Sequence, residues 1–243
     1  MTEPLVRVDG RGTADLRPLK AEMGYLDWAE GSVLLEMGKT RVLASASYEP
    51  KPPRFLQGTG NGWVTAEYAM LPRSTAVRTP REVQAGRPSG RTQEIQRLVG
   101  RSLRSVTGLE QMGEGTIWID CDILQADGGT RTASITAGYL ALAQAMARLT
   151  EAGTLRADLL HDTVAAVSVG IVEGQFLLDL AYDEDAKADV DFNVVMTGSG
   201  QLVEVQGTAE GKVFSREELD SLIDLAASGI EQLTDFQRQI LAR

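Results

Sequence analysis

The spacing of apolar residues predicts strands in both halves of the chain. Residues 115–125 alternate between two sets of positions, which is the pattern of a strand with one buried side. The predicted strand carries Ile117, Ile119, Cys121 and Ile123 on one side and Trp118, Asp120, Asp122 and Leu124 on the other. Three pairs of apolar runs, each joined at a glycine-containing turn, predict hairpins at 32–38 with 40–49, 164–172 with 175–182, and 191–197 with 201–207.

Apolar residues at intervals of three and four predict three helices. The first covers residues 91–106, and a long second helix opens within residues 126–134 and runs through Leu149. The third begins at Ser215, where Ser215 and Glu218 have the spacing of a capping box. Its predicted buried face carries Leu219, Leu222, Ile223 and Ala226. Residues 50–63, rich in proline and glycine, are expected to form a loop.

Each half of the chain is therefore a set of strands followed by a long helix. No linker-like segment separates the halves, and their sequences are too different to count as a repeat. The pattern predicts an α+β fold in which residues 1–243 form a single domain of duplicated β-α-β architecture. Its two pseudo-repeated halves span about residues 12–150 and 155–240.

Composition narrows the class of protein. With 43% hydrophobic and 24% charged residues the chain is typical of a soluble globular protein. No apolar run approaches the roughly 18 residues of a membrane span, and the first residues lack the apolar core of a signal peptide. The single cysteine excludes internal disulfides and a multi-cysteine zinc site. Together these features predict a cytoplasmic protein with no membrane partner.

The chain also has a single histidine, which excludes histidine-dependent triads and HExxH metal sites. His161 has no partner motif and is expected at the surface or at the edge of a loop. Carboxylates, arginines, hydroxyls and backbone amides are left, with a metal ion as a further option. Those groups suit phosphoryl transfer.

Positive charge is concentrated in one segment although the net charge is −10. Between Arg73 and Arg104 there are eight arginines and only two glutamates. Electrostatic attraction acts locally, over about 8–10 Å, so this segment can bind an anion within an acidic protein. The planar guanidinium of arginine also grips phosphate oxygens in pairs. The distribution predicts a polyanionic ligand.

Two places combine glycine with a cation at a predicted helix start. The first is the DGGTRT turn, where Gly129, Thr130 and Arg131 would offer free N–H groups and side-chain donors to a phosphate. The second is Gly90 followed by Arg91. The alternatives are an ordinary capped turn and a solvated stripe formed by Arg91, Arg97, Arg101 and Arg104. A cation at a helix start opposes the helix dipole and so favours a bound anion, and the stripe lacks acidic partners one turn away.

An acidic stretch is the candidate metal site. Residues 179–193 contain Asp179, Asp183, Glu184, Asp185, Asp189 and Asp191 against one lysine. If the segment is extended, Asp183, Asp185, Asp189 and Asp191 share one side. Magnesium takes one or two carboxylates and completes its shell with water and substrate phosphates. A solvated acidic loop is an equally good interpretation of this stretch alone. Asp120 and Asp122 are expected to support the site or to pair with the arginine helix.

Four long segments carry a resemblance to a known family: residues 62–75, 90–104, 120–136 and 193–211. From about Asp9 to the final helix the chain resembles the bacterial ribonuclease PH family of phosphorolytic 3′→5′ exoribonucleases. That resemblance implies trimming of transfer-RNA precursors, with ribosomal-RNA processing alongside it, release of nucleoside 5′-diphosphates, and the reverse nucleotidyltransferase reaction. It also implies a duplicated fold shared with polynucleotide phosphorylase and exosome ring subunits, and a homo-hexamer built as a trimer of dimers.

The resemblance also implies roles for individual residues. The phosphate-binding residues would be Arg91, Gly129, Thr130 and Arg131, and the catalytic, magnesium-linked aspartates would be Asp185 and Asp191. Arginines that contact RNA or a neighbouring subunit would be Arg73, Arg78, Arg81 and Arg97. Inorganic phosphate would be the co-substrate and magnesium the cofactor. Phe192 stands where the family pattern leads us to expect methionine.

Two other functions are weighed against this one. A hydrolytic, metal-dependent nuclease would need more carboxylates around its metals and no phosphate pocket. A non-catalytic RNA-binding ring subunit would be expected to lack Arg91, Asp185 or Asp191, and this chain has all three.

Overall fold

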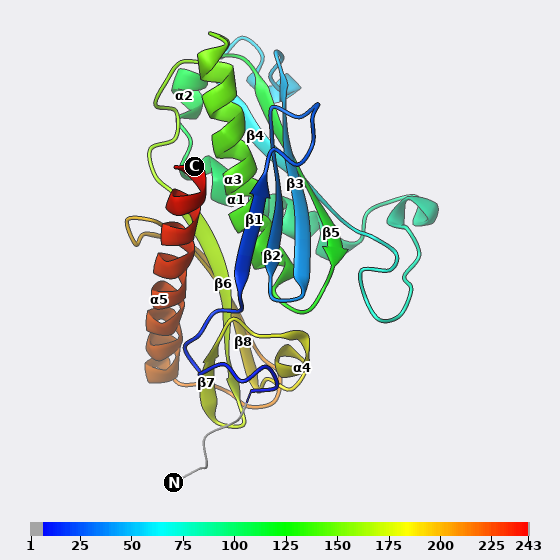
Figure 1. Cartoon of the computed structure of the whole chain (residues 1–243), viewed down its shortest axis with the longest axis vertical. Helices are drawn as coiled ribbons and strands as arrows, with labels where there is room; N and C mark the ends of the chain where they lie inside the picture. Colours follow the sequence, from blue (N-terminus) through cyan, green and yellow to red (C-terminus); the bar gives the residue numbers. More distant parts are fainter. Residues whose placement is uncertain (1–6, 243) are drawn as a thin grey trace.

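Two β-sheets form the frame of the protein (Figure 1). The computed structural model describes residues 7–242. The first sheet, in the order β1-β2-β3-β5-β4, contains β1 (Leu19–Met23), β2 (Gly31–Met37), β3 (Thr40–Glu49), β4 (Trp63–Met70) and β5 (Thr116–Gln125). The second, in the order β7-β6-β8-β9, contains β6 (Val164–Val172), β7 (Gln175–Leu178), β8 (Val190–Thr197) and β9 (Leu202–Ala209). Neighbouring strands are antiparallel except β4 and β5, which are parallel and joined through a helix.

Helices connect and cover the sheets. They are α1 (Gly90–Arg104), α2 (Leu109–Met112), α3 (Thr130–Glu151), α4 (Tyr182–Asp185) and α5 (Arg216–Leu241), with 3-10 turns at Arg54–Leu56 and Glu82–Ala85. The long helix α3 packs against β2, β3 and β5 of the first sheet and against β6 and β8 of the second. Helix α5 packs along the second sheet and against α3. The helix α3 is buried on most of its circumference because it contacts both sheets.

The predicted α+β class is confirmed, and so are three hairpins and three long helices. The second hairpin is shorter than predicted, because β7 ends at Leu178 and residue 182 already belongs to α4. In β5 the isoleucine and cysteine side chains of the predicted apolar side are 0–1% exposed. Ser215 caps α5, and its capping box with Glu218 is present. The predicted loop at 50–63 contains the short 3-10 turn. Strands β1 and β4 were not predicted. In β4 the apolar signal is weakened because the small residue Ala66 lies between Val64 and Tyr68 on the buried side.

A close contact between β2 and α3 holds the first sheet on the central helix. At Gly31, an added Cβ would lie 2.0 Å from the carbonyl oxygen of Ala141 and 2.7 Å from the backbone nitrogen of Ala145. Only glycine fits at this start of β2. One buried apolar cluster then continues from the first sheet through α3 to β6, β8 and α5. Among the described helices, none has the length and apolar character to cross a bilayer.

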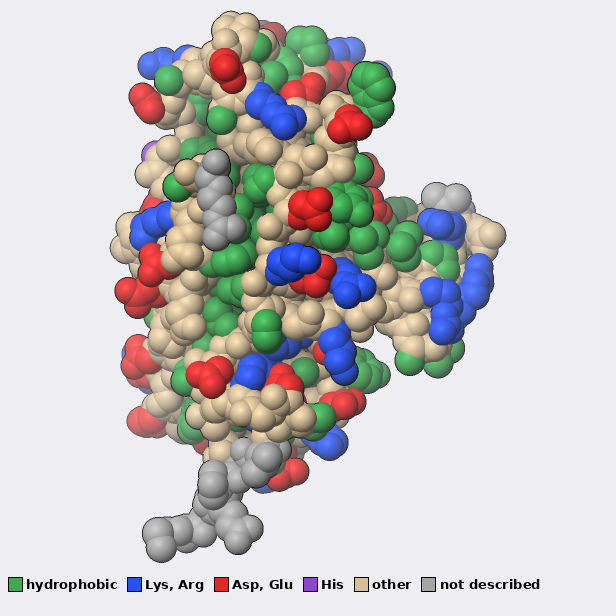
Figure 2. Space-filling view, in the orientation of Figure 1, with side chains coloured by type: hydrophobic (Ala, Val, Ile, Leu, Met, Phe, Trp, Pro, Cys, Tyr) green, Lys and Arg blue, Asp and Glu red, His purple; other side chains and the backbone are tan. Residues whose placement is uncertain are grey.

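The segment between β4 and α1, residues 71–89, projects from the body of the molecule as an arm (Figure 1). Figure 2 shows Lys and Arg side chains gathered on this arm. Its four arginines, Arg73, Arg78, Arg81 and Arg87, are all exposed. The arm is therefore a positively charged surface that stands apart from the two sheets.

Candidate active site

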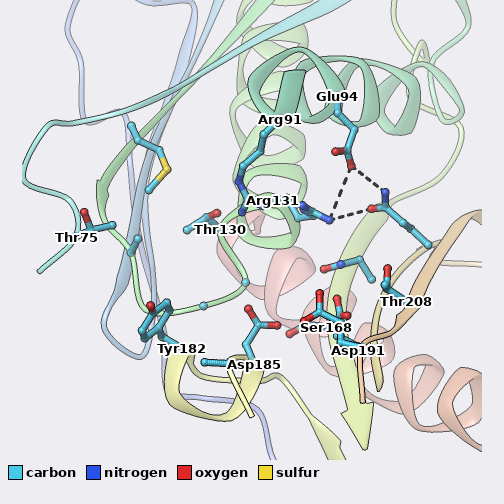
Figure 3. A pocket seen from close by; sticks show the side chains of 18 residues that line it. Thr75, Arg91, Glu94, Thr130, Arg131, Ser168, Tyr182, Asp185, Asp191 and Thr208 are labelled. Atoms are coloured by element: carbon cyan, nitrogen blue, oxygen red, sulfur yellow. Dashed lines mark hydrogen bonds and ion pairs between the residues drawn. The ribbon is translucent and has the colours of Figure 1, made fainter. Parts of the chain in front are cut away.

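One pocket of about 630 Å³ brings together residues from both sheets and three helices (Figure 3). It is lined by every residue that the sequence nominated for phosphate or for catalysis: Arg91, Gly129, Thr130, Arg131, Asp185 and Asp191. The cationic residues come from the starts of α1 and α3, and the two aspartates come from α4 and β8. Positive and negative side chains thus face the same space.

The start of α3 offers its backbone N–H groups to the pocket. Gly129 precedes the helix in the left-handed conformation, with φ 62°, and no side chain in the described part of the chain caps these amides. By contrast, Ser89 and Ser215 cap α1 and α5 with side-chain hydrogen bonds. An uncapped helix start leaves up to four amide donors unsatisfied, and an anion can bind them.

Thr130 is held by a neighbour from the first sheet. The hydroxyl of Tyr68 in β4 donates to Thr130 Oγ1 at 3.0 Å. Burial raises the pKa of Tyr68, so the phenol stays protonated and keeps this donor role. Because Thr130 accepts from Tyr68, its own hydroxyl proton is available to a ligand.

The guanidinium of Arg131 lies in a hydrogen-bonded group that joins three elements (Figure 3). Its Nη1 atom donates to Gln206 Oε1 on β9 at 2.9 Å and lies 3.8 Å from Glu94 Oε1 on α1. Gln206 in turn donates from Nε2 to Glu94 Oε1 at 2.9 Å. The side chain of Arg91, one turn before Glu94, is exposed and makes no hydrogen bond or salt bridge with any residue in 7–242. Its charge is therefore free to meet a ligand.

The two aspartates form the opposite wall of the pocket. Enclosure in the pocket raises the pKa of Asp185, and it also raises the pKa of Asp191, to which repulsion by Asp185 and Glu210 adds. Arg131 acts in the other direction on both groups. Two carboxylates that repel each other at neutral pH are stabilised by a cation between them.

The two carboxylates of the pocket match the number of protein ligands that magnesium needs. Within the described residues no cluster of three or more His, Cys, Asp or Glu side chains could hold a metal ion. Magnesium differs from zinc and calcium in needing only one or two protein carboxylates, with water and substrate phosphate as its other ligands. Asp185 and Asp191 supply that number.

The expectation that four aspartates share one side is wrong. Residues 182–185 form the helical turn α4 instead of an extended segment, so the parity of a strand does not apply to them. Asp183 is exposed and does not line the pocket. Asp189 lies beside Lys212, with 3.3 Å between Oδ2 and Nζ. Of the four, the pocket contains Asp185 and Asp191.

The remaining arginines lie outside the pocket. Arg73, Arg78 and Arg81 are exposed on the arm, and Arg97 is exposed on α1. The sequence suggested that the arginine stripe on α1 has no partners. Two of its arginines do have partners, which other elements supply. Arg101 forms a salt bridge with Glu204 of β9, and the guanidinium of Arg104 lies 4.2 Å from the ring centroid of Trp63.

The supporting role predicted for Asp120 and Asp122 stays a prediction. They lie on the side of β5 opposite its buried isoleucines, line no part of the pocket, and form no salt bridge within residues 7–242. Burial raises the pKa of both, and Glu67 and then Asp122 add to the effect on Asp120. His161 is exposed at the end of a loop, as predicted. Cys121 is buried and unpaired.

Sequence reasoning missed the polar residues of β9 and the acidic partner on α1. Gln206 and Thr208 of β9 and Glu210, which follows the strand, line the pocket at alternate positions, and Glu94 follows Arg91 by three residues. The spacing itself was a usable signal, since residues two apart on a strand and three apart on a helix share a face. Without the fold, however, nothing indicated that β9 runs past the start of α3.

Comparison with known proteins gives consistent matches over most of the chain. The model of the 3′ exoribonuclease family, RNase PH, matches its domain 1 at residues 15–147 and its domain 2 at residues 162–229. Ribonuclease PH of Moorella thermoacetica is 60% identical over 237 residues, covering 98% of this chain and 95% of the relative. Ribonuclease PH of Bacillus subtilis is 54% identical and covers 97% of both chains.

Solved structures share the fold at lower sequence identity. A chain of the Archaeoglobus fulgidus exosome with RNA bound to the active site superposes with a TM-score of 0.79 at 22% identity, covering 94% of this chain and 91% of that chain. A chain of an archaeal exosome core has a TM-score of 0.72 at 21% identity, with 98% and 91% covered. These likenesses concern the fold alone.

Proposed function

The chain belongs to the RNase PH family of 3′ exoribonucleases, and from this we propose that its pocket is where inorganic phosphate attacks the 3′ end of an RNA strand. The protein is a phosphorolytic 3′→5′ exoribonuclease. One observation carries the assignment of the site: an uncapped helix start and two arginines face two aspartates across a single pocket. The residue roles that follow are part of this proposal.

Phosphate binds between Arg91 and the start of α3, where Gly129, Thr130 and Arg131 supply amide, hydroxyl and guanidinium donors. One of its oxygens attacks the last phosphodiester phosphorus of the RNA. The new P–O bond forms as the bond to the departing 3′ oxygen breaks, and that oxygen takes up the proton of the attacking hydrogenphosphate. The products are a nucleoside 5′-diphosphate and an RNA shorter by one residue with a free 3′ hydroxyl.

This chemistry needs no histidine. The attacking group is already an oxyanion, so catalysis comes from alignment and from neutralising charge. The reaction exchanges one phosphoester linkage for one diphosphate linkage, so the same site adds nucleotides from diphosphates in the reverse direction. His161 is exposed and lines no part of the pocket, which agrees with this account.

Asp185 and Asp191 would hold magnesium, which supplies positive charge to the phosphate oxygens when it is bound. The aspartates themselves orient the 3′ end of the RNA by occupying the wall opposite the arginines. Their raised pKa values and their mutual repulsion are the features that support this assignment.

RNA outside the pocket would contact the arginines of the arm and of α1: Arg73, Arg78, Arg81 and Arg97. They are exposed and form no salt bridge with any residue in 7–242, which suits contacts with backbone phosphates, and such contacts carry no sequence information. We propose that the protein assembles as a homo-hexamer, a trimer of dimers in which the arm contacts a neighbouring copy. Its proposed substrate is the 3′ end of transfer-RNA precursors, in the cytoplasm. The RNase PH names of the relatives support this substrate.

We also assign both halves, at about residues 12–150 and 155–240, to one domain. The buried apolar cluster continues through both sheets, and the pocket takes residues from each of them. Neither half alone contains the phosphate-binding residues and the aspartates together.

The decisive experiment measures RNA trimming with and without inorganic phosphate and identifies the released nucleotides. Nucleoside 5′-diphosphates that appear only when phosphate is present are the expected result. Monophosphates released in phosphate-free buffer would establish a hydrolytic nuclease instead. RNA binding without any trimming would establish a non-catalytic ring subunit.

A further inference from the structure

A buried network of charged side chains lies directly behind the pocket. It consists of Arg7, Arg11, Arg17, Asp179 and Glu184, and we call it the N-terminal network. The side chains of Arg7 and Asp179 are 0% exposed, and that of Arg17 is 2% exposed. The arginines come from the segment before β1, and the carboxylates flank the loop that leads into α4.

Arg17 connects the phosphate-binding turn with the second sheet. Its Nε and Nη2 atoms donate to the two carboxylate oxygens of Asp179 at 2.9 and 2.7 Å, and its backbone N–H donates to the same carboxylate at 2.8 Å. Its Nη1 atom donates to the carbonyl of Asp127, within the turn that precedes α3. A single planar guanidinium thus spans both sides of the site.

Arg7 makes the matching connection to the turn that carries Asp185. Its Nε and Nη2 atoms donate to the two oxygens of Glu184, both at 2.7 Å. It also donates to the carbonyls of Leu178 and Asp179 at 2.9 and 3.0 Å. Glu184 accepts from the N–H of Ala181 at 2.8 Å and so closes the turn α4, of which Asp185 is the last residue.

The two turns that the network holds are in direct contact. At Gly128, an added Cβ would lie 2.6 Å from the carbonyl oxygen of Leu180 and 2.9 Å from the backbone nitrogen of Tyr182. An added Cβ at Gly129 would lie 2.9 Å from Nη2 of Arg17. A small displacement of the network therefore moves the start of α3 relative to α4.

Stability alone is a poor reason for such a network. Buried ion pairs lose so much hydration that apolar replacements are often as stable or more stable. Asp179 also adopts φ 54°, a left-handed conformation that aspartate tolerates better than most residues. A buried charge network concentrated beside a pocket, with contacts to both of its turns, indicates a positioning role.

We propose that Arg17 and Asp179 are positioning residues, which set the distance between the phosphate-binding turn and Asp185. They touch no reacting atom and act through Gly129–Arg131 on one side and α4 on the other. This inference rests on the proposed function, because the phosphate and the RNA end must meet between these two turns.

The test replaces Asp179→Asn, which keeps the side-chain shape and tolerates the left-handed backbone. We expect kcat/KM for phosphate to fall about 10- to 100-fold, the cost of a misplacement near 1 Å, while KM for RNA stays within about twofold. Phosphate should also raise the unfolding temperature of the variant less than that of the unaltered protein, which reports binding independently of turnover. Arg17→Lys is the second variant, because lysine keeps the charge but cannot span Asp179 and the turn.

The matched control is Leu233→Ala on α5, which lowers stability through a fully buried side chain that does not line the pocket. Its kcat/KM for phosphate should be unchanged well below its unfolding temperature. The proposal is overturned if either network variant folds and keeps kcat/KM for phosphate within about twofold of the unaltered protein. It is also overturned if Leu233→Ala lowers kcat/KM as much as the network variants do, or if neither network variant folds. The phosphate requirement of the unaltered protein is measured before any variant. If that protein trims RNA without phosphate, the proposed function is refuted instead.

Discussion

Arg91→Ala tests the phosphate site most directly, because Arg91 is the one pocket cation without a protein partner in the described part of the chain. A hydrogen bond to a charged group contributes about 1.5–3 kcal/mol. Arg91 is exposed at the pocket rim, so the lower end of this range applies. About 1.5 kcal/mol corresponds to a rise of roughly tenfold in KM for phosphate. The free energy of unfolding should change by less than about 0.5 kcal/mol, since no buried partner is left behind.

The assay follows nucleoside diphosphate release over a phosphate titration at saturating RNA. Arg238→Ala is the matched control, since it removes one positive charge from an exposed site on α5 that does not line the pocket. KM for phosphate should be unaltered in the control. If Arg91→Ala leaves KM within about twofold of the unaltered protein, the anion is not bound at this place and the reasoning fails.

Three further outcomes follow from the structure. Gly128→Ala should lower stability by about 1–3 kcal/mol in urea unfolding, because its φ is 76° and its Cβ would meet Leu180; an unchanged midpoint would contradict the close contact. Although burial opposes ionisation, hydrogen bonds from Arg7 and from the Ala181 N–H lower the pKa of Glu184. The stabilisation by ionised Glu184 is therefore present above its unfolded pKa of about 4.3 and is lost as pH falls through the lower folded value. Glu184→Gln should accordingly flatten the plot of unfolding free energy against pH between about pH 5 and 3. An equally steep plot for the variant refutes this. Replacing Arg73, Arg78 and Arg81 together by alanine should make the plot of log binding constant for RNA against log salt concentration less steep, by about 0.7 per lost phosphate contact, without altering KM for phosphate. An unchanged slope would show that the arm does not contact RNA.

Much of the fold could be predicted because its strands and helices have clear periods. The isoleucines of β5 and the capping box at Ser215 are local signals, and each needed only a few neighbouring residues to be recognised. The glycines and cations at the starts of α1 and α3 were equally local. These signals identified the half of the pocket that is formed by the starts of α1 and α3.

What the sequence could not predict depends on contacts between distant segments. Arg7 and Glu184 are 177 residues apart, and nothing in the spacing of either indicates the other. The helical turn α4 is fixed by that contact together with the hydrogen bond from Ala181, so a strand-like parity was assigned to Asp183 and Asp189 in error. The partners of Arg101 and Arg131 on β9 were missed for the same reason.

The network behind the pocket has a consequence for synthesis on the ribosome. The arginines of the network, at residues 7–17, are made 162 to 177 residues before their carboxylate partners Asp179 and Glu184. Folding during translation proceeds from the amino end, so the early segment has to wait for the late one. A nascent chain that stops before Asp179 and Glu184 therefore lacks the assembled network, and its nuclease activity depends on residues made long after the arginines.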